Sequence, residues 1–420
     1  MNRLTYIKNK IIICLSILIL QLTFVYAQAN TFLLKSPSPS MNGMGEMGAS
    51  FRSSDPFSIY YNPANGLKSF DGVSVSHAKM ETPWLRYLLQ DIILEYEVWN
   101  VGVLPERYPF KIKIGYLKTY LDLGEQFRTD PQGNGLGSVN AYYKADGITI
   151  TGGFAHKIWK IPFISSIGYT YKSVEEKLSI STFDGTDKSI NHTTANSNYN
   201  DFGVLLSIPF EFLNLPNSDI SITITPTFGY SVSNVGDSVY YIAPQQSHSG
   251  PRYLRTGISL ENTIKYKSAW NLLDWQIGRE AADLLVEKSY PLIKYQSGLG
   301  DIDFFDNVIK NKSNDLVTVQ RGYELTVLDF YTLRRGKYID DGGIIDLETS
   351  GYGIKSTGVF YLLHFLLDER LFKLIPEFFE LQYNYSEWDA GRGHPLHYTD
   401  FESWTLSVNN IDKIVTNLLK

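Results

Sequence analysis

Apolar and polar residues alternate along most of the chain. Ile220, Ile222 and Ile224 are separated by serine and threonine residues, and the same alternation recurs over 379–386 and 403–409. A period of two places successive side chains on opposite faces of an extended chain, so each segment predicts a β-strand with one apolar and one polar face. A soluble β-sandwich and a membrane β-barrel both carry this pattern, and alternation alone does not separate them.

The number and length of these segments favour a barrel. Most reach about ten residues, the length that a tilted strand needs to cross a bilayer, whereas strands of soluble proteins average about five or six. Bacterial single-chain barrels have an even number of strands. We therefore predict an all-β fold, a transmembrane antiparallel β-barrel of about 14 strands. The predicted strands lie near 70–80, 91–103, 109–120, 137–145, 146–157, 163–181, 199–210, 218–233, 253–266, 267–278, 314–332, 350–366, 376–388 and 400–410.

Aromatic residues gather near the ends of these segments, for example at Tyr60, Tyr61, Trp84 and Trp388. Membrane barrels carry aromatic girdles at both membrane interfaces, so we interpret these residues as girdle residues. The core of a soluble sandwich is the alternative interpretation.

The connections between the predicted strands differ in length. Barrels pair short periplasmic turns with long outer loops, and both kinds are present. A tight turn is predicted at 145–147, and two stretches read as helices, either a folded outer loop or a helical element in a long connection. These stretches are 279–288 and 301–312, and the long polar connections are 121–136, 182–198 and 234–252.

Residues 1–27 have the three parts of a secretory signal peptide: a basic start, an apolar core and a small-residue cleavage site that ends at Ala27. The single cysteine, Cys14, lies in the apolar core. Cleavage after Ala27 leaves a chain without cysteine, which suits an exported protein that has no disulfides. A signal peptide and a barrel together predict the cell outer membrane of a Gram-negative bacterium, with outer-membrane lipid as a partner.

The amino-acid composition excludes several other classes of protein. Of the 420 residues, 14% are aromatic, which is too many for a disordered chain. A mean hydropathy of −0.15, without repeated apolar runs of about 18 residues, argues against a bundle of membrane helices. The formal net charge is −6, and binding to phosphates needs lysine and arginine, so we expect no nucleic-acid partner.

Residues 32–67 differ from the rest of the chain. Two Ser-Pro pairs lead into a glycine-rich run, and an acidic residue and an Asn-Pro-Ala motif follow. Glycine lets backbones approach closely, and a barrel of fourteen strands encloses more space than its own side chains fill. A segment of this kind has room to pack inside the barrel. The residues that define the motif are Gly43, Gly45, Gly48, Asp55, Asn62, Pro63 and Ala64.

This motif resembles the start of the FadL-like outer-membrane barrels, in particular their PorV/PorQ branch. A second likeness to the late strands of that branch lies at 324–336, 340–343 and 350–354. Two residues depart from the pattern: Glu46 interrupts the glycine run, and Asn65 is inserted before the next glycine. The chain also continues past its last predicted strand, either as a short helix or because that strand is misplaced.

The resemblance implies four parts of the chain. They are a signal peptide at 1–27, an N-terminal plug or hatch segment at 28–68, a transmembrane barrel with long outer loops at 69–410, and a C-terminal tail at 411–420. The motif residues are then the plug or hatch motif, which lies inside the lumen.

The resemblance also implies the function, which is a channel or transporter for hydrophobic small molecules. An apolar pocket near the outer rim would capture the molecule, and the plug would then shift. The alternative is a PorV-like subunit of type IX protein secretion, whose outer loops bind secreted proteins or a translocon subunit. A structural barrel or surface receptor is a third hypothesis.

Some residues resemble reactive sites by letter only. The run 43–48 fits G-x-G-x-x-G but does not lie between a strand and a helix, where a dinucleotide site would need it. His394 and His397 have no cysteine or paired carboxylate beside them. His77 and His156 lie in alternating strands with no partner that the sequence fixes. We therefore expect no enzyme activity, no cofactor and no metal site.

Overall fold

The computed structural model describes residues 30–68, 72–84, 92–104, 109–129, 132–159, 161–178, 193–214, 219–236, 238–239, 248–267, 270–289 and 292–418. The predicted signal peptide, with Ala27, lies outside the described residues. Helical elements are few and short. They are η1 (Thr31–Leu34), α2 (Pro39–Asn42), α3 (Ser58–Tyr61), the π-helix η3 (Phe304–Ile309), α4 (Ser356–Leu367), α5 (Arg370–Phe378) and α6 (Ile411–Leu418).

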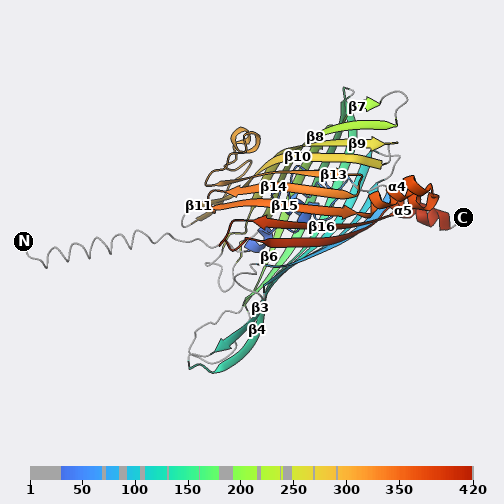
Figure 1. Cartoon of the computed structure of the whole chain (residues 1–420). Coiled ribbons are helices and arrows are strands. Elements are labelled where there is room, and N and C mark those ends of the chain that lie inside the picture. Colours follow the sequence, from blue (N-terminus) through green and yellow to red (C-terminus); the bar gives the residue numbers. More distant parts are fainter. Residues whose placement is uncertain are drawn as a thin grey trace, which may run out of the picture.

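Strands make up the rest of the architecture (Figure 1). They are β1 (Gly72–Pro83), β2 (Ile93–Leu104), β3 (Phe110–Thr129), β4 (Gly135–Ile158), β5 (Ile161–Leu178), β6 (Thr193–Ser207), β7 (Phe210–Asn214), β8 (Ile220–Gly236), β9 (Tyr253–Tyr266), β10 (Trp270–Leu284), β11 (Val286–Ser289), β12 (Leu292–Tyr295), β13 (Val317–Val327), β14 (Tyr331–Asp340), β15 (Ile345–Lys355), β16 (Phe379–Asp389) and β17 (Thr399–Val408).

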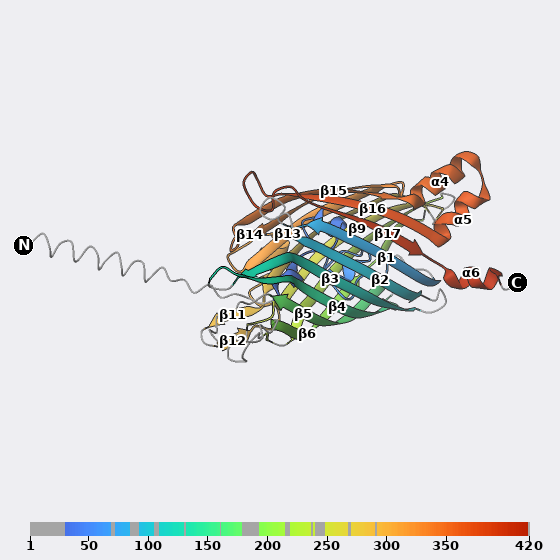
Figure 2. The same ribbon diagram turned by 90° about the horizontal axis from the view of Figure 1, so that it is seen from below.

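Antiparallel pairing closes the main sheet into a barrel (Figure 2). β1 pairs with both β2 and β17, and β6 pairs with both β5 and β8, so no free edge is left between these strands. The sheet has fifteen strands among the described residues, and the short β7 continues β6 along the same side of β8. Counting β6 and β7 as one interrupted strand, the barrel wall has fourteen strands. The predicted fold class is confirmed.

The wall has its apolar face outside and its polar face inside. On β17, Trp404 and Leu406 are 58% and 50% exposed, while Ser403 and Thr405 between them are buried. A soluble sandwich would bury the apolar face, so that alternative is wrong. A closed barrel with an apolar outer belt satisfies every wall hydrogen bond and meets lipid with hydrocarbon, which is the architecture of an outer-membrane barrel. The chain is an outer-membrane protein.

Among the helices that the structure describes, none is long and apolar enough to cross a membrane.

The two ends of the barrel differ. At one end the connections are short, as between β4 and β5, β9 and β10, and β13 and β14. At the other end lie longer connections, including the one from β10 to β13, which carries β11, β12 and η3. Because barrels of this class have short periplasmic turns and long outer loops, we call these the inner end and the outer end. The exceptions at the inner end are the hairpin of α4 and α5 between β15 and β16, and the tail helix α6.

The predicted strand count was right, but two errors cancelled. The predicted turn at 145–147 lies in the middle of β4, whose pairing with β3 and β5 runs through Ala145, Asp146 and Gly147 without a break. The predicted strand 314–332 contains the whole of β13, a turn and the start of β14, a strand that was not predicted. The single β4 removes one strand from the count, and β14 restores it.

The helical predictions also need correction. Residues 279–284 belong to β10, because Glu280 and Asp283 continue the pairing with β9 and β13. The second stretch, 301–312, does contain η3. The predicted strand 350–366 ends at Lys355, and α4 follows it directly. The tail forms α6, so its short-helix alternative holds.

The long outer connection folds back against the outside of the wall. Val308 of η3 and Ile302 before it are buried against Leu254, Ala281 and Val319, which belong to β9, β10 and β13. This cluster covers the outer ends of three strands. The outer surface is therefore not a uniform apolar belt on this side.

Candidate functional site

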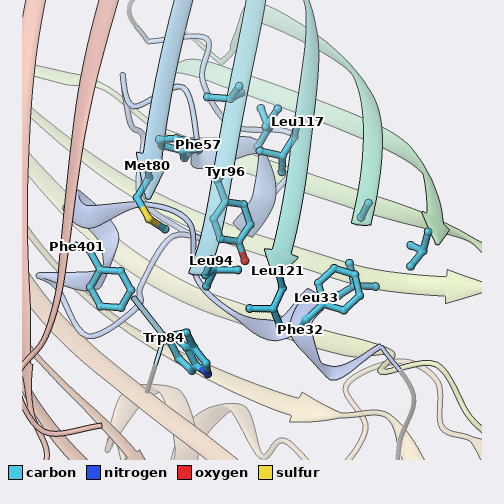
Figure 3. Close-up of a cluster of buried hydrophobic side chains, with 14 of the residues drawn as sticks. Phe32, Leu33, Phe57, Met80, Trp84, Leu94, Tyr96, Leu117, Leu121 and Phe401 are labelled. Atoms are coloured by element: carbon cyan, nitrogen blue, oxygen red, sulfur yellow. The ribbon is translucent and has the colours of Figure 1, made fainter. Parts of the chain in front are cut away.

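The N-terminal segment, residues 30–68, lies inside the barrel, and we call it the luminal segment. Phe32, Leu33 and Phe57 of this segment belong to one buried cluster with Leu94 of β2 and Leu121 of β3 (Figure 3). All five side chains are at most 8% exposed. The segment thus shares one apolar core with inward-facing residues of β2 and β3, on a part of the wall whose inner face is apolar.

Glycines on the wall make room for the backbone of the luminal segment. A Cβ atom at Gly168 or Gly203 would overlap Pro63, and one at Gly229 would overlap the Ala49 carbonyl. A Cβ at Gly322 or Gly336 would overlap Met44 in the same way. Because only glycine lacks a Cβ, these wall positions hold the segment close to five strands, β5, β6, β8, β13 and β14.

One wall carboxylate holds the centre of the luminal segment. The Glu280 carboxylate accepts hydrogen bonds from the backbone N–H groups of Gly48, Ala49 and Ser50 at 3.0, 3.1 and 2.7 Å, and from the Ser50 hydroxyl at 2.7 Å. Glu280 is 1% exposed, so its charge is balanced by these donors rather than by solvent. We call this group the Glu280 latch. The latch could not be recognised from the sequence, because Glu280 lies within a run that reads as a helix.

Asn62 and Pro63 of the Asn-Pro-Ala motif tie the luminal segment to the wall. Asn62 Nδ2 donates to the Ala49 carbonyl at 2.8 Å and to the carbonyl of Val204 on β6 at 3.0 Å. Its Oδ1 accepts the N–H of Ala64 at 2.9 Å, and the Pro63 carbonyl accepts from the Thr151 hydroxyl at 2.6 Å. The motif is thus a fixed turn that is hydrogen-bonded to another part of the luminal segment and to strands β4 and β6 of the wall.

Replacing Asn62 and Pro63 together by alanine should loosen the luminal segment and raise the entry of small hydrophobic dyes. The change removes a buried amide and leaves the Val204 carbonyl without its partner, at a cost of about 1–3 kcal/mol. Dye influx into proteoliposomes checks this, with retained barrel folding judged by mobility on an unheated gel. Unchanged influx through a folded double variant would contradict a closing role for the segment.

Asp55 organises the start and the middle of the luminal segment. Its Oδ1 accepts the Phe57 N–H at 2.9 Å, and its Oδ2 accepts the hydroxyls of Ser38 and Ser40. Asp55 is 4% exposed. The acidic residue of the motif therefore joins two turns of the segment, and it also lines a polar cavity of the lumen.

The glycine run makes close turns against late strands. Gly45 has a φ of 76° and its N–H donates to the Thr349 hydroxyl at 2.9 Å, while Gly43 lies against Arg334 and Gly351. Glu46, which interrupts the run, has a φ of 63°, a left-handed conformation that favours glycine. The deviation from the family pattern therefore falls on a backbone position that suits glycine better.

The side chain of Glu46 faces cations inside the lumen. Burial raises the pKa of Glu46 to about 7, and the charges of Arg255 and Lys35 oppose that rise. Burial likewise lowers the pKa of Lys35. Glu46 is therefore partly protonated near neutral pH, and the luminal segment is not held by a fixed ion pair at this point.

Aromatic residues that the sequence assigned to membrane girdles lie inside the barrel instead. Tyr61 is fully buried, and Trp84 and Trp388 are 7% and 2% exposed. The Arg255 guanidinium lies over the rings of Tyr60 and Tyr61, at 5.3 and 5.4 Å from their centroids. The prediction was wrong for these four residues: Tyr60 and Tyr61 lie on α3, and Trp84 and Trp388 lie at strand ends but are buried. Phe330 and Tyr331, which the sequence grouped with them, are 39% and 37% exposed, as girdle residues should be.

Below the luminal segment, toward the inner end, lies a polar cavity of about 280 Å³. Its charges are paired: Lys68 lies 3.4 Å from Asp274, and Arg334 lies 2.6 Å from Glu324. An apolar groove of about 680 Å³ lies on the outside of the wall, across β5 to β10 and against Ile309 of η3. This apolar groove lies on the outside of the wall, whereas the family resemblance implied an apolar pocket near the outer rim.

The other residues singled out in the sequence are distributed over the surface. His77 lies against Trp99, with ring centroids 4.0 Å apart, and His397 is 2.9 Å from Asp389. His394 accepts the Leu396 N–H within its own turn. His156 stacks between Phe154 and Phe163. These side chains do not converge on one place.

The fold and lumen together define the class: an outer-membrane β-barrel that holds its own N-terminal segment inside. No family model matches the chain, and no curated protein matches it. The PorV/PorQ branch and a role in type IX secretion are therefore not confirmed.

Solved structures of outer-membrane barrels are similar to the chain. The toluene transporter TbuX of Ralstonia pickettii is 12% identical, with a TM-score of 0.41, over 90% of this chain and 99% of its own. A Pseudomonas aeruginosa FadL homologue is 11% identical, with a TM-score of 0.35, over 89% and 98%. The transport unit of the Escherichia coli autotransporter AIDA-I is 9% identical, with a TM-score of 0.37, over 82% and 91%. Barrels of different function match at similar levels, so these likenesses do not distinguish one cargo from another.

Proposed function

We propose that the protein is an outer-membrane transporter of small hydrophobic molecules, and that the luminal segment is its movable closure. The observation that carries the proposal is the way the segment is held. It fills the lumen, yet every attachment described above is a hydrogen bond, an ion pair or a packing contact, and these can break and reform.

The apolar groove supports hydrophobic cargo. Its volume falls within the range of about 300–1,000 Å³ that is usual for small-molecule sites. Leu206, Phe228, Leu260 and Ile277 line it and face the lipid side of the wall. A hydrophobic molecule that has entered the membrane can therefore reach the groove without crossing water.

The same part of the wall carries the Glu280 latch on its inner face. Arg279 lines the groove, and its guanidinium donates to the Ile309 carbonyl of η3, while the next residue, Glu280, holds the luminal segment. On β9, Leu260 lines the groove and the Ser259 hydroxyl donates to the Ser50 carbonyl at 2.8 Å. Filling of the groove would shift strands that hold the latch.

The polar cavity suits release. A molecule that passes the displaced segment meets paired charges, which bind an apolar molecule weakly, and conduction requires weak enough binding for the molecule to leave. The transporter would thus bind its cargo outside and release it toward the inner end.

Replacing Leu260 and Ile277 together by tryptophan should fill the groove and slow uptake of a small aromatic hydrocarbon. Loss of about 60 Å² of apolar contact costs about 1.5 kcal/mol, which is about tenfold weaker binding. The matched control is Leu406→Trp, on an exposed belt position of β17 that is outside the groove. Equal uptake by the groove variant and the control would show that the groove is not the entry site.

Purification in mild detergent, with mass spectrometry of everything that travels with the protein, tests the proposed function directly. A stoichiometric fatty acid or hydrocarbon would support the transporter. A stoichiometric secreted protein or translocon subunit, without such a molecule, would contradict it.

A further inference from the structure

The hairpin formed by α4 and α5 exposes an apolar surface at the inner end of the barrel. On α4, Val359, Leu362 and Leu366 are 38%, 42% and 66% exposed, and their spacing of three and four residues places them on one helix face. Phe365 and, on α5, Leu371 are 69% and 62% exposed. A cluster of exposed apolar residues of this kind marks a site that contacts another protein or a membrane.

A neighbouring side of α4 is attached to the barrel. Gly358 lies against the Leu328 carbonyl in the turn between β13 and β14, and its N–H donates to the Asp329 carbonyl at 3.0 Å. Tyr361 packs against Trp270 at the start of β10, with ring centroids 6.0 Å apart. These contacts fix the orientation of the helix, so the apolar face is held outward.

The exposed face continues the apolar belt of the wall. α4 begins directly after β15, where Ile354 is 39% exposed, and α5 ends directly before β16, where Phe379 and Leu381 are 49% and 46% exposed. β15 and β16 are neighbours in the wall, and no linker separates either helix from its strand. Figure 2 shows the hairpin beside the ends of these two strands. Lipid that covers the belt therefore meets the hairpin next.

The dimensions and charges suit the membrane interface. The twelve residues of α4 span about 18 Å, too short for the bilayer core of about 30 Å. The hairpin also exposes charged residues of both signs, Asp368, Glu369, Arg370, Lys373 and Glu377, which can stay among the lipid headgroups while the apolar face enters the acyl region. We propose that α4 and α5 form an interfacial anchor that inserts its apolar face into the inner leaflet of the outer membrane.

A single-cysteine label tests the anchor without altering the wall. In a chain with Cys14→Ser, Leu366→Cys is labelled with an environment-sensitive fluorophore and placed in phosphatidylcholine vesicles that contain doxyl-labelled lipids. We expect several-fold stronger quenching by shallow doxyl groups than by iodide. Two references bracket this result: Leu406→Cys on the belt, which lipid should quench, and Ile344→Cys in the turn after β14, which is 88% exposed and which iodide should quench.

A Leu366→Cys label that behaves like the Ile344→Cys label would overturn the anchor, because the purified protein has no other partner to cover the hairpin. Val359→Cys, nearer the base of the helix, provides a second reading if the first variant does not fold. Both outcomes are independent of the cargo, so the anchor and the proposed transport can fail separately.

Discussion

Replacing Glu280 by alanine should turn the closed barrel into a leaky one. The carboxylate accepts four hydrogen bonds from Gly48, Ala49 and Ser50, and the variant leaves three backbone N–H groups inside the lumen without an acceptor. Hydrogen bonds to charged groups contribute about 1.5–3 kcal/mol each, and not all of that is recovered when the segment relaxes. A loss of about 4 kcal/mol raises the ratio of open to closed barrels about a thousandfold.

Single-channel conductance in planar bilayers, together with dye influx, measures this effect. Glu280→Gln keeps one carbonyl acceptor and the shape of the side chain, so its leak should fall between those of the wild type and Glu280→Ala. Glu348→Ala, an exposed glutamate on β15, is the matched control and should conduct like the wild type. A folded Glu280→Ala barrel that stays closed would show that the latch does not hold the closure.

The barrel could be predicted from the chain because its wall obeys a local rule. Alternation such as Trp404, Thr405, Leu406 sets which face is apolar, and the number of long segments sets the class. What alternation does not state is which face points inward. That depends on the surrounding solvent, and here lipid places the apolar face outside, as the exposure of Leu406 and the burial of Thr405 show.

The errors arose where local composition and long-range pairing disagree. Asp146 and Gly147 have the composition of a turn, yet two neighbouring strands pair straight through them. Strand β14 was not predicted because it contains two consecutive arginines, Arg334 and Arg335. Inside the lumen, the Arg334 guanidinium donates hydrogen bonds to Glu324 at 2.6 Å and to Asn384 at 3.0 Å. A buried inward charge is tolerated when it is paired, and the sequence does not reveal its partner.

In the luminal segment, too, local features could be predicted from the sequence and long-range contacts could not. Its motif residues could be recognised, because glycine and an Asn-Pro turn have conformational meaning on their own. Its attachment points could not, since Glu280 and Thr151 lie far along the chain and their role depends on the closed wall. The structure brings Asn62, Pro63 and Ala64 together with wall glycines and places Gly43 against Gly351 of β15, whereas Asp55 binds other parts of the segment.

Replacing Gly168 by valine should push the luminal segment off the wall. A Cβ at this position overlaps the Pro63 carbonyl and the Ala64 N–H, and these are backbone atoms that cannot rotate away as a flexible side chain would. Either the wall or the segment must move, and the wall is fixed by pairing with β4 and β6 on both sides. We expect the segment to move, with a rise in conductance comparable to that of Glu280→Ala.

Gly152→Val is the matched control. Gly152 lies on β4, beside the partner of Gly168 in the pairing register, but a Cβ there meets only the ring of Phe110 at 3.9 Å. Both substitutions add the same apolar volume and the same β-branched side chain to neighbouring strands. A conductance that rises in both barrels would point to damage of the wall itself. A rise confined to Gly168→Val would assign the closure to contact between the wall and the luminal segment, because contact with that segment is the main difference between the two positions.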